Sequence, residues 1–326
     1  MSLKYILIII IVSIFGQIFG QNGNFSSLSM FNQMYYNPGY AGDGNDIEAR
    51  VLVREQNMKF PGAPRTQTFN IDAPFKLLGQ RHGVGLSILN DGYGNISNTE
   101  LNISYAYRKS LIQGELGMGI GLNMVSHGFA DGAVWLAPDG TDGKDDAIIP
   151  SDLSQQPFLI DVNLGVFYRA DNLYLSISGR NMTDTKVEYI AENGGDAASG
   201  SNTKQTIIAK QIYFSTGYDY QLPNPMYSIQ PSAFVATDFS STQLSITSLL
   251  TYNKRFFGGL GYKPTDAVIF IAGIDLPSGI HAAVSYDVTT SRLTKYSSGS
   301  FEFMAGYKFS LEIDKDNRKY KSVRFL

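Results

Sequence analysis

Apolar and polar residues alternate along much of the chain, most clearly in the segment 300–311. Phe301, Phe303 and Tyr307 fall on one side of a strand, while Glu302 and Lys308 fall on the other. The alternation covers about twelve residues, which is twice the usual length of a strand in a soluble protein. A tilted strand that crosses a membrane needs about 9–11 residues. The segment therefore fits either one face of a long soluble sandwich strand or the wall of an outer-membrane barrel.

The same period recurs along the chain and predicts a protein built from about fourteen strands. In 98–108, for example, Leu101 and Ile103 alternate with Glu100 and Asn102. In 115–126 the polar side is mostly glycine, which lets an opposite wall or a plug approach closely; a phosphate-binding loop is the weaker interpretation. The predicted strands are 47–56, 66–73, 83–89, 98–108, 115–126, 158–169, 173–178, 207–221, 227–237, 243–253, 256–263, 267–276, 279–288 and 300–311.

The connections between these strands divide by length. If the first strand leaves the periplasm, the longer connections all fall at one rim: 57–65, 90–95, 127–156, 179–206 and 289–299. The other rim receives mostly short ones: 109–113, 170–172, 221–226, 254–255 and 277–278. Because an open sheet edge in hydrocarbon leaves backbone groups unpaired, the sheet must close. We therefore predict an all-β transmembrane outer-membrane β-barrel of about fourteen antiparallel strands, with long extracellular loops and short periplasmic turns.

The chain divides into four parts. Residues 1–20 predict a signal peptide, because Lys4 precedes an apolar run and Gly20 is a small residue before a plausible cleavage site; a signal-anchor helix is the alternative. Residues 21–46 form a periplasmic leader, either flexible or docked on the barrel as a plug. Residues 47–311 form the barrel. Residues 312–326 form a basic periplasmic tail, which is either disordered or docked on a partner or on the barrel wall.

The composition agrees with a barrel and excludes several kinds of site. Aromatic residues make up 13% and charged residues 17% of the chain, while the mean hydropathy of −0.10 is too polar for a bundle of transmembrane helices. The net charge of −3 argues against a general nucleic-acid-binding protein. The chain has no cysteine, which excludes disulfides, thiolate metal sites, a cysteine nucleophile and a lipidated N-terminal cysteine.

Residues with catalytic or metal-binding chemistry are few and scattered. His82 and His281 belong near the periplasmic rim and His127 near the outer rim, so neither a zinc site nor a Ser-His-Asp set is expected. The acidic run 139–146 carries carboxylates of the kind that calcium prefers, but its spacing does not match an EF-hand and favours a solvated loop. We predict no catalytic residue, no metal site and no cofactor. An acid-pair hydrolase on the outer loops is the least favoured function.

Several motifs follow one another in a specific order. They are Phe31-Asn32, Tyr36-Asn37-Pro38-Gly39-Tyr40-Ala41-Gly42, Arg54-Glu55-Gln56 followed by Pro61, Phe69-Asn70-Ile71-Asp72-Ala73-Pro74, Gly83-Val84-Gly85-Leu86, Asn90-Asp91-Gly92-Tyr93-Gly94, the strand 300–309 and the ending 319–326. In these motifs the chain resembles the PorP/SprF family of type IX secretion system membrane proteins of Bacteroidetes. The resemblance covers nearly the whole mature chain. One departure is Gly39, where the family usually has alanine.

The resemblance implies an outer-membrane barrel that serves the secretion or surface attachment of a cargo protein. Such a cargo carries a C-terminal sorting domain, as large gliding-motility adhesins do. The implied partners are this cargo and other components of the type IX secretion machinery. The strand pattern adds outer-membrane lipid, and the net charge predicts no nucleic-acid partner. We predict from this a non-enzymatic receptor or anchor for an exported protein.

The residues themselves leave a second function open, an outer-membrane porin or transporter for small solutes. Inward charged residues could line a channel or could pair across a filled lumen; they are Glu100, Arg108, Asp161, Arg169, Asp219, Asp275, Asp287, Glu302 and Lys308. For a receptor, contacts are expected outside at Tyr93, Phe129 and Trp135, because aromatic residues are enriched at protein interfaces. On the periplasmic side the candidates are Arg324, Phe325 and Leu326.

Overall fold

The computed structural model describes residues 25–129, 158–183, 186–190, 203–207 and 209–310. The predicted signal peptide, the acidic run 139–146 and the basic tail 312–326 lie outside these residues. So do four of the candidate contact residues, Trp135, Arg324, Phe325 and Leu326. Within the described part, no helix is both long enough and apolar enough to cross a membrane.

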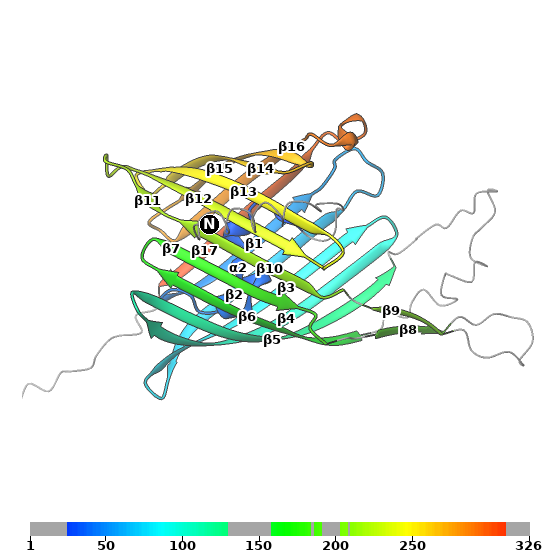
Figure 1. The fold of residues 1–326 in the computed structure, drawn as a ribbon, viewed down its shortest axis with the longest axis horizontal. Coiled ribbons are helices and arrows are strands. Elements are labelled where there is room, and N and C mark those ends of the chain that lie inside the picture. The colour runs from blue at the N-terminus through cyan, green and yellow to red at the C-terminus, as the bar shows by residue number, and fades with distance from the viewer. Residues whose placement is uncertain (1–24, 130–157, 184–185, 191–202, 208, 311–326) are drawn as a thin grey trace, which may run out of the picture.

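Fifteen strands form one antiparallel sheet that closes on itself (Figure 1). β1 pairs with β17, and β10 pairs with β12, so the sheet has no open edge. β10 and β11 pair with the same neighbour and only Asp219 separates them, so the barrel has fourteen strands, as predicted. They are β1 (Asp46–Glu55), β2 (Arg65–Leu77), β3 (Gln80–Tyr93), β4 (Ile96–Leu111), β5 (Gly114–Phe129), β6 (Phe158–Ala170), β7 (Leu173–Arg180), β10 (Gln211–Tyr218) with β11 (Tyr220–Gln221), β12 (Tyr227–Thr237), β13 (Thr242–Tyr252), β14 (Phe256–Lys263), β15 (Ala267–Asp275), β16 (Ile280–Thr289) and β17 (Ser300–Ser310).

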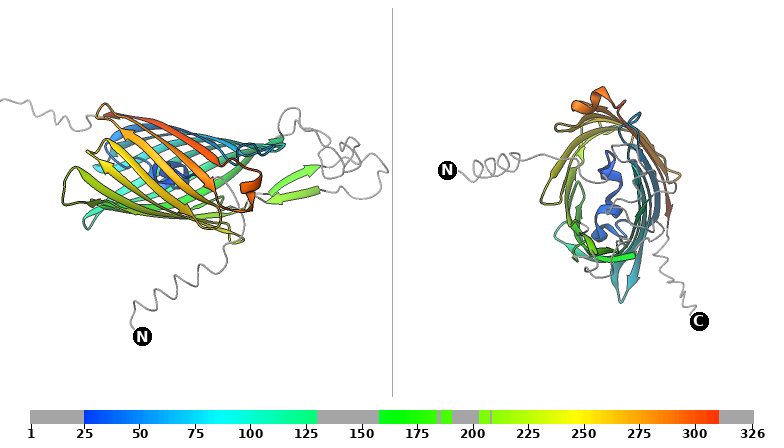
Figure 2. Two further views of the ribbon diagram at one scale, coloured as in Figure 1. Left: turned by 90° about the horizontal axis from the view of Figure 1, so that it is seen from above. Right: turned by 90° about the vertical axis from the view of Figure 1, so that its right-hand side faces the viewer.

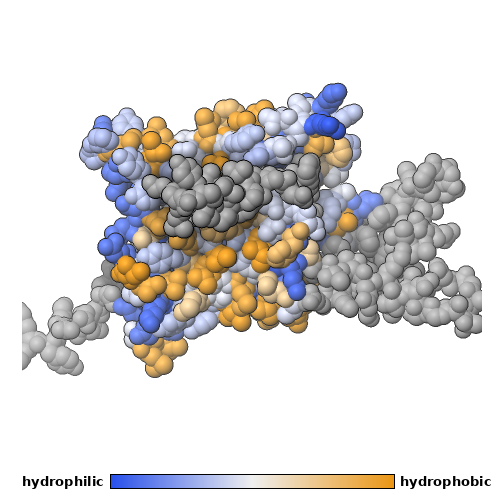
Figure 3. All heavy atoms as spheres, in the orientation of Figure 1, coloured by the Kyte–Doolittle hydropathy of each residue, from blue (hydrophilic) through white to orange (hydrophobic). Residues whose placement is uncertain are grey.

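The two faces of the wall differ in chemistry because side chains alternate along each strand. In β17, Phe301, Phe303 and Phe309 are exposed on the outer surface, whereas Ser300 and Glu302 are buried in the lumen. Figure 3 shows apolar residues over the visible side of the barrel and strongly hydrophilic ones toward its two ends. An exposed apolar band of this extent fits contact with lipid rather than with water.

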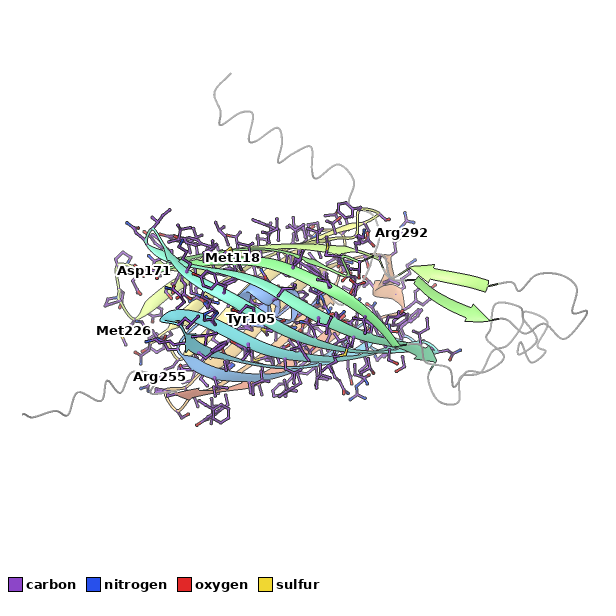
Figure 4. All side chains as sticks on the ribbon, turned by 90° about the horizontal axis from the view of Figure 1, so that it is seen from below. Tyr105, Met118, Asp171, Met226, Arg255 and Arg292 are labelled. Atoms are coloured by element: carbon purple, nitrogen blue, oxygen red, sulfur yellow. The ribbon has the colours of Figure 1, made fainter. Side chains whose placement is uncertain are left out.

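The two rims differ in their connections. At one, the turn rim, every connection has two to five residues: 78–79, 112–113, 171–172, 222–226, 253–255 and 276–279. The other, the loop rim, carries short turns and also the long connections 56–64, 130–157, 181–210 and 290–299, the last of which contains the helix η5 (Arg292–Lys295). In Figure 4, Asp171, Met226 and Arg255 lie at the turn rim and Arg292 lies at the loop rim.

Two connections at the loop rim differ from the prediction. The predicted loop 90–95 is a two-residue turn, because β3 continues to Tyr93 and β4 begins at Ile96. The predicted loop 179–206 contains strand structure, since β8 (Lys186–Ile190) pairs with β9 (Thr203–Ile207) in a separate two-stranded sheet beyond the barrel end (Figure 2). Backbone pairing continues in both places after the apolar alternation ends, and only that alternation was visible in the sequence.

Residues 25–45, called here the inner segment, lie inside the barrel (Figure 2). The segment consists of three short helical turns, η2 (Ser29–Phe31), α2 (Gln33–Tyr36) and η3 (Pro38–Tyr40). Leu28, Met34 and Ala41 are fully buried, and their apolar contacts with inward residues of the wall form the core of the molecule. The hydrophobic core of this protein is therefore in the lumen, beside a large number of buried polar groups.

Candidate functional site

The inner segment runs along the lumen from the loop-rim half to the turn rim. Near its start, Ser27 bonds Lys263 and Asp287, which lie at the loop-rim ends of β14 and β16. Near its end, Asp43 pairs with Arg108 and Arg169, which lie at the turn-rim ends of β4 and β6. The segment and the wall residues that hold it form the candidate site.

The turn 37–42 lies against four wall glycines, Gly83, Gly117, Gly119 and Gly165, called here the glycine floor. A Cβ atom on Gly83 would be 1.9 Å from the carbonyl oxygen of Ala41, and one on Gly117 would be 2.2 Å from that of Gly39. Backbone atoms cannot rotate away from such a contact as a side chain can. The glycines of the lumen face therefore leave the space that the turn occupies.

Asn37 fixes the start of this turn to the wall. Its Nδ2 donates to the carbonyl oxygen of Val166 at 2.9 Å and to Oγ of Ser176 at 2.8 Å. Its Oδ1 accepts from the backbone N–H of Gly39 at 2.7 Å. The side chain is fully buried, so water cannot replace these bonds. An aspartate of the same shape would offer no donor and would bury a charge.

We expect Asn37→Asp to lower the free energy of unfolding by about 2–4 kcal/mol, measured by urea titration of the purified barrel in detergent. Asn224→Asp is the matched control. Asn224 is exposed at the turn rim, and its side chain only accepts a bond from the Met226 N–H, which an aspartate can also accept. Its effect should stay within about 0.5 kcal/mol. Equal effects of the two substitutions would contradict the role assigned to Asn37.

Arg108 holds the turn-rim end of the segment. Its Nη1 donates to three consecutive carbonyl oxygens, those of residues 39–41, at 3.2–3.4 Å. Its Nη2 pairs with Asp43 at 2.5 Å, and its Nε bonds Glu115. Arg169 pairs with the second oxygen of Asp43 at 2.5 Å. Because Arg108 is only 1% exposed, its charge is balanced by protein groups alone.

A cluster of four charged side chains holds the loop-rim end; they are Arg54, Lys263, Asp287 and Glu302. Ser27 Oγ donates to Asp287 at 2.6 Å and accepts from Lys263 at 2.7 Å, and the Ser27 N–H donates to Glu302 at 2.8 Å. Arg54 bridges Asp287 at 3.0 Å and Glu302 at 3.1 Å. The cluster contains two cations and two anions, so the buried charges are balanced.

Aromatic residues fill the middle of the lumen. The guanidinium of Arg180 lies 4.0 Å from the centre of the Tyr35 ring and pairs with Glu100 at 2.6 Å. The Tyr36 ring packs against Tyr213 and Phe234 of the wall. Burial raises the pKa of Tyr40 to about 12, against the opposing effect of the nearby Arg50 guanidinium. The Tyr40 hydroxyl therefore stays protonated at neutral pH and accepts a bond from Arg50 Nη2 at 2.9 Å.

Several inward charged residues that could line a channel are instead paired. Glu100, Arg108, Arg169, Asp287 and Glu302 each form an ion pair with the wall or with the inner segment. Asp275 and Lys308 pair with each other at 3.6 Å at the turn rim. In the described part of the chain, no group of three or more His, Cys, Asp or Glu side chains is placed to hold a metal ion.

The three histidines are divided between the two rims. His82 and His281 are near the turn-rim ends of β3 and β16, and His127 is near the loop-rim end of β5. His82 stacks on Phe75, and His281 Nε2 lies 3.1 Å from Glu48.

The sequence matches the model of the family described as type IX secretion system membrane protein PorP/SprF over residues 19–307. The chain belongs to this family. This match confirms the family resemblance that the motifs indicate. The protein is therefore a membrane protein of a secretion-system family. Among curated proteins, no significant match was found.

Solved outer-membrane barrels resemble this PorP/SprF-family protein in architecture. The outer membrane protein Omp33 of Acinetobacter baumannii has 7% identity and a TM-score of 0.43, and covers 82% of this chain and 100% of its own. The toluene transporter TodX of Pseudomonas putida has 11% identity and a TM-score of 0.46, covering 89% and 95%. The toluene transporter TbuX of Ralstonia pickettii has 8% identity and a TM-score of 0.47, covering 85% and 93%. Likenesses this weak carry no argument about function.

Of the candidate contact residues in this PorP/SprF-family barrel, two can be placed. Tyr93 ends β3 and Phe129 ends β5, both at the loop rim. Ile96, at the start of β4, pairs with both of them in the sheet. Tyr93 is 36% exposed. The structure therefore brings these two positions to the same part of the loop rim.

The residues that hold the inner segment were not identified from the sequence by their role. Asn37 and Gly39 stood only within a family motif, and Arg108 only among the inward charges. The sequence did offer one signal for this site, which is the presence of glycine on the polar side of separate predicted strands. Gly119 and Gly165 are direct cross-strand neighbours, but only the register of the sheet brings them together.

Proposed function

We propose that this barrel is a non-enzymatic receptor or anchor in the outer membrane. In this role it serves the secretion or surface attachment of a cargo protein that carries a C-terminal sorting domain, such as a gliding-motility adhesin. Membership of a type IX secretion system family supports the secretion role. The closed barrel with an apolar outer surface supports the outer membrane as its location. Export by a signal peptide at 1–20 remains a prediction.

The occupied lumen is the observation that carries this proposal. The inner segment is held by a backbone turn on the glycine floor and by ion clusters at both of its ends. A solute passing through would have to displace a segment whose polar groups bond the wall, and each bond broken in a buried place is costly. Contacts with other proteins are therefore favoured at the rims and loops.

We assign the turn rim to the periplasm and the loop rim to the cell exterior, because short turns face the periplasm in outer-membrane barrels. Under this assignment Asp46 and Ser310 lie at the periplasmic end, where the basic tail 312–326 can reach components of the secretion machinery. Tyr93 and Phe129 then lie at the outer end, beside the connection that carries Trp135.

Conductance in planar lipid bilayers tests whether the lumen is closed. The intact barrel should show no steady ion current, and a variant lacking residues 21–42 should conduct, because its lumen loses the inner segment. A variant lacking 312–326 is the control and should stay closed. If the intact barrel conducted as freely as the 21–42 deletion, the porin or transporter function would be favoured instead.

Crosslinking and affinity purification of the tagged barrel from its native membrane, followed by mass spectrometry, test the receptor role. Secretion-machinery components and at least one protein with a C-terminal sorting domain should be recovered. Recovery of the sorting-domain protein should fall when Tyr93, Phe129 and Trp135 are all replaced by alanine at unchanged barrel levels. Undiminished recovery would reject these contact residues, and no sorting-domain protein at all would reject the receptor.

A further inference from the structure

A cavity of about 180 Å³ lies beside the inner segment, in the turn-rim half of the lumen. Met30 of the inner segment forms one side, and strands β6, β7, β10, β12 and β13 form the other. The cavity reaches the rim at the exposed turn residues Asp171 and Asn172. An engineered cavity of about 150 Å³ binds benzene. The space is thus large enough for one long side chain of another segment.

Asp219 lines this cavity and is the residue that interrupts the strand between β10 and β11. Its backbone N–H donates to the carbonyl oxygen of Asn172 at 2.7 Å, which ties it to the turn between β6 and β7. Its Oδ2 accepts from Gln230 Nε2 at 3.2 Å. Its Oδ1 is buried and has no hydrogen-bond partner among the described residues. A buried carboxylate oxygen without a donor is costly, so a ligand that supplies one would be stabilised.

The charges around the cavity favour a cation. Arg169 is the one basic residue in its lining, and it is already paired with Asp43 at 2.5 Å. Asp171 and Asp219 form no ion pair within the part of the chain that the structure describes. Tyr174 adds an aromatic ring to the lining, and aromatic faces attract cations.

We propose that this cavity binds a lysine or arginine side chain that enters from the turn rim. The occupant is a basic residue of this chain's own segment 312–326, which contains Lys315, Arg318, Lys319, Lys321 and Arg324 and follows Ser310 at the same rim. Nine extended residues reach about 30 Å at about 3.3 Å each, comparable to the width of a fourteen-stranded barrel with strands about 4.8 Å apart.

The cysteine-free chain allows a direct test of the charge preference. Ser232, which lines the cavity, is replaced by cysteine, and its labelling is compared for two thiosulfonate reagents of similar size, one with a trimethylammonium and one with a sulfonate group. The cation-to-anion rate ratio should fall about tenfold in the Asp219→Asn variant. It should not change in Asp275→Asn, since Asp275 is an exposed carboxylate of the same rim. Equal ratios in all three proteins would overturn the proposal.

A second measurement leaves Asp219 in place. Agmatine, which carries a guanidinium group, should slow the labelling of Ser232→Cys, whereas acetate at the same concentration should not. Equal rates with both compounds would also overturn the proposal.

Deletion of 312–326 tests this occupant. If the tail is the occupant, the deletion should speed the labelling of Ser232→Cys, and a synthetic peptide of residues 312–326 should slow it again in an Asp219-dependent way. If the deletion changes nothing, the tail does not occupy the cavity and the proposal is overturned. These measurements use the purified barrel without cargo, so they can fail or succeed independently of the receptor role.

Discussion

Arg108→Met is expected to lower the free energy of unfolding of the barrel by about 3–5 kcal/mol, because it removes one cation from a buried network of charges and leaves the facing anions in place. Methionine has a similar length but offers no donor. The carbonyl oxygens of residues 39–41 would lose their shared partner, and Asp43 and Glu115 would each lose one cation. Urea titration in detergent measures the change. Arg108→Lys should recover only part of the loss, since an ammonium keeps the charge but not the guanidinium fork.

The control for this substitution is Arg65→Met. The Arg65 side chain is 62% exposed and its pair with Glu55 is 3.5 Å long, so solvent screens the interaction and its loss should cost less than about 1 kcal/mol. If Arg65→Met and Arg108→Met had equal effects, the network around Arg108 would not stabilise the barrel beyond an ordinary surface pair.

Gly83→Val is expected to displace the turn 37–42 and to cost about 3 kcal/mol of stability, near the upper end for overpacking. The Cβ atom would meet the Ala41 carbonyl oxygen at 1.9 Å and its carbon at 2.3 Å. Neither partner can move easily, because Gly83 is fixed in the sheet between Pro74 and Ala106. The variant should also conduct ions in planar bilayers, since the displaced turn no longer fills its part of the lumen.

Gly258→Val provides the comparison for Gly83→Val. A Cβ atom on Gly258 has no neighbour closer than 3.7 Å, so this change should leave the current absent and the stability within about 1 kcal/mol of the parent. A Gly83→Val barrel that stayed closed and as stable as Gly258→Val would show that the glycine floor does not position the segment.

The effects of Arg108→Met and Gly83→Val on the free energy of unfolding should not be additive. Arg108 and Gly83 both contact the backbone of residues 39–41. Once one substitution has displaced the turn, these contacts are already broken, so the second substitution lowers the free energy of unfolding by less. A double variant should therefore lose less than the sum of the single losses. This result would identify the turn as one cooperative unit and would separate its loss from general weakening of the wall.

If the inner segment is a fixed part of the fold, the barrel resembles a scaffold more than a conduit. Many polar groups of its lumen bond residues 25–45, and its rims remain available for other proteins. This arrangement is compatible with a receptor that stays sealed while cargo is handled at its ends. It also predicts that substitutions inside the lumen act on stability and closure before they act on partner binding.

The wall of the barrel could be predicted from the alternation of apolar and polar residues along the chain. The outward side chains of every strand face the same apolar surroundings. Each strand can therefore be recognised from its own sequence by apolar residues at every second position. Fourteen predicted strands match the fourteen of the barrel, and Phe256–Lys263 has the predicted bounds. The composition also excluded cysteine chemistry without any structure.

The contacts on the polar side of each strand, by contrast, depend on the three-dimensional fold. A lumen position requires merely a small or polar residue, and many pairings satisfy that requirement. Asn37 meets Ser176 across 139 positions of the chain, and Arg54 meets Asp287 across 233. Such contacts depend on the register of all strands and on the path of the inner segment. Alternation along one strand carries no information about either, because it records which side a residue faces and not which residue it meets.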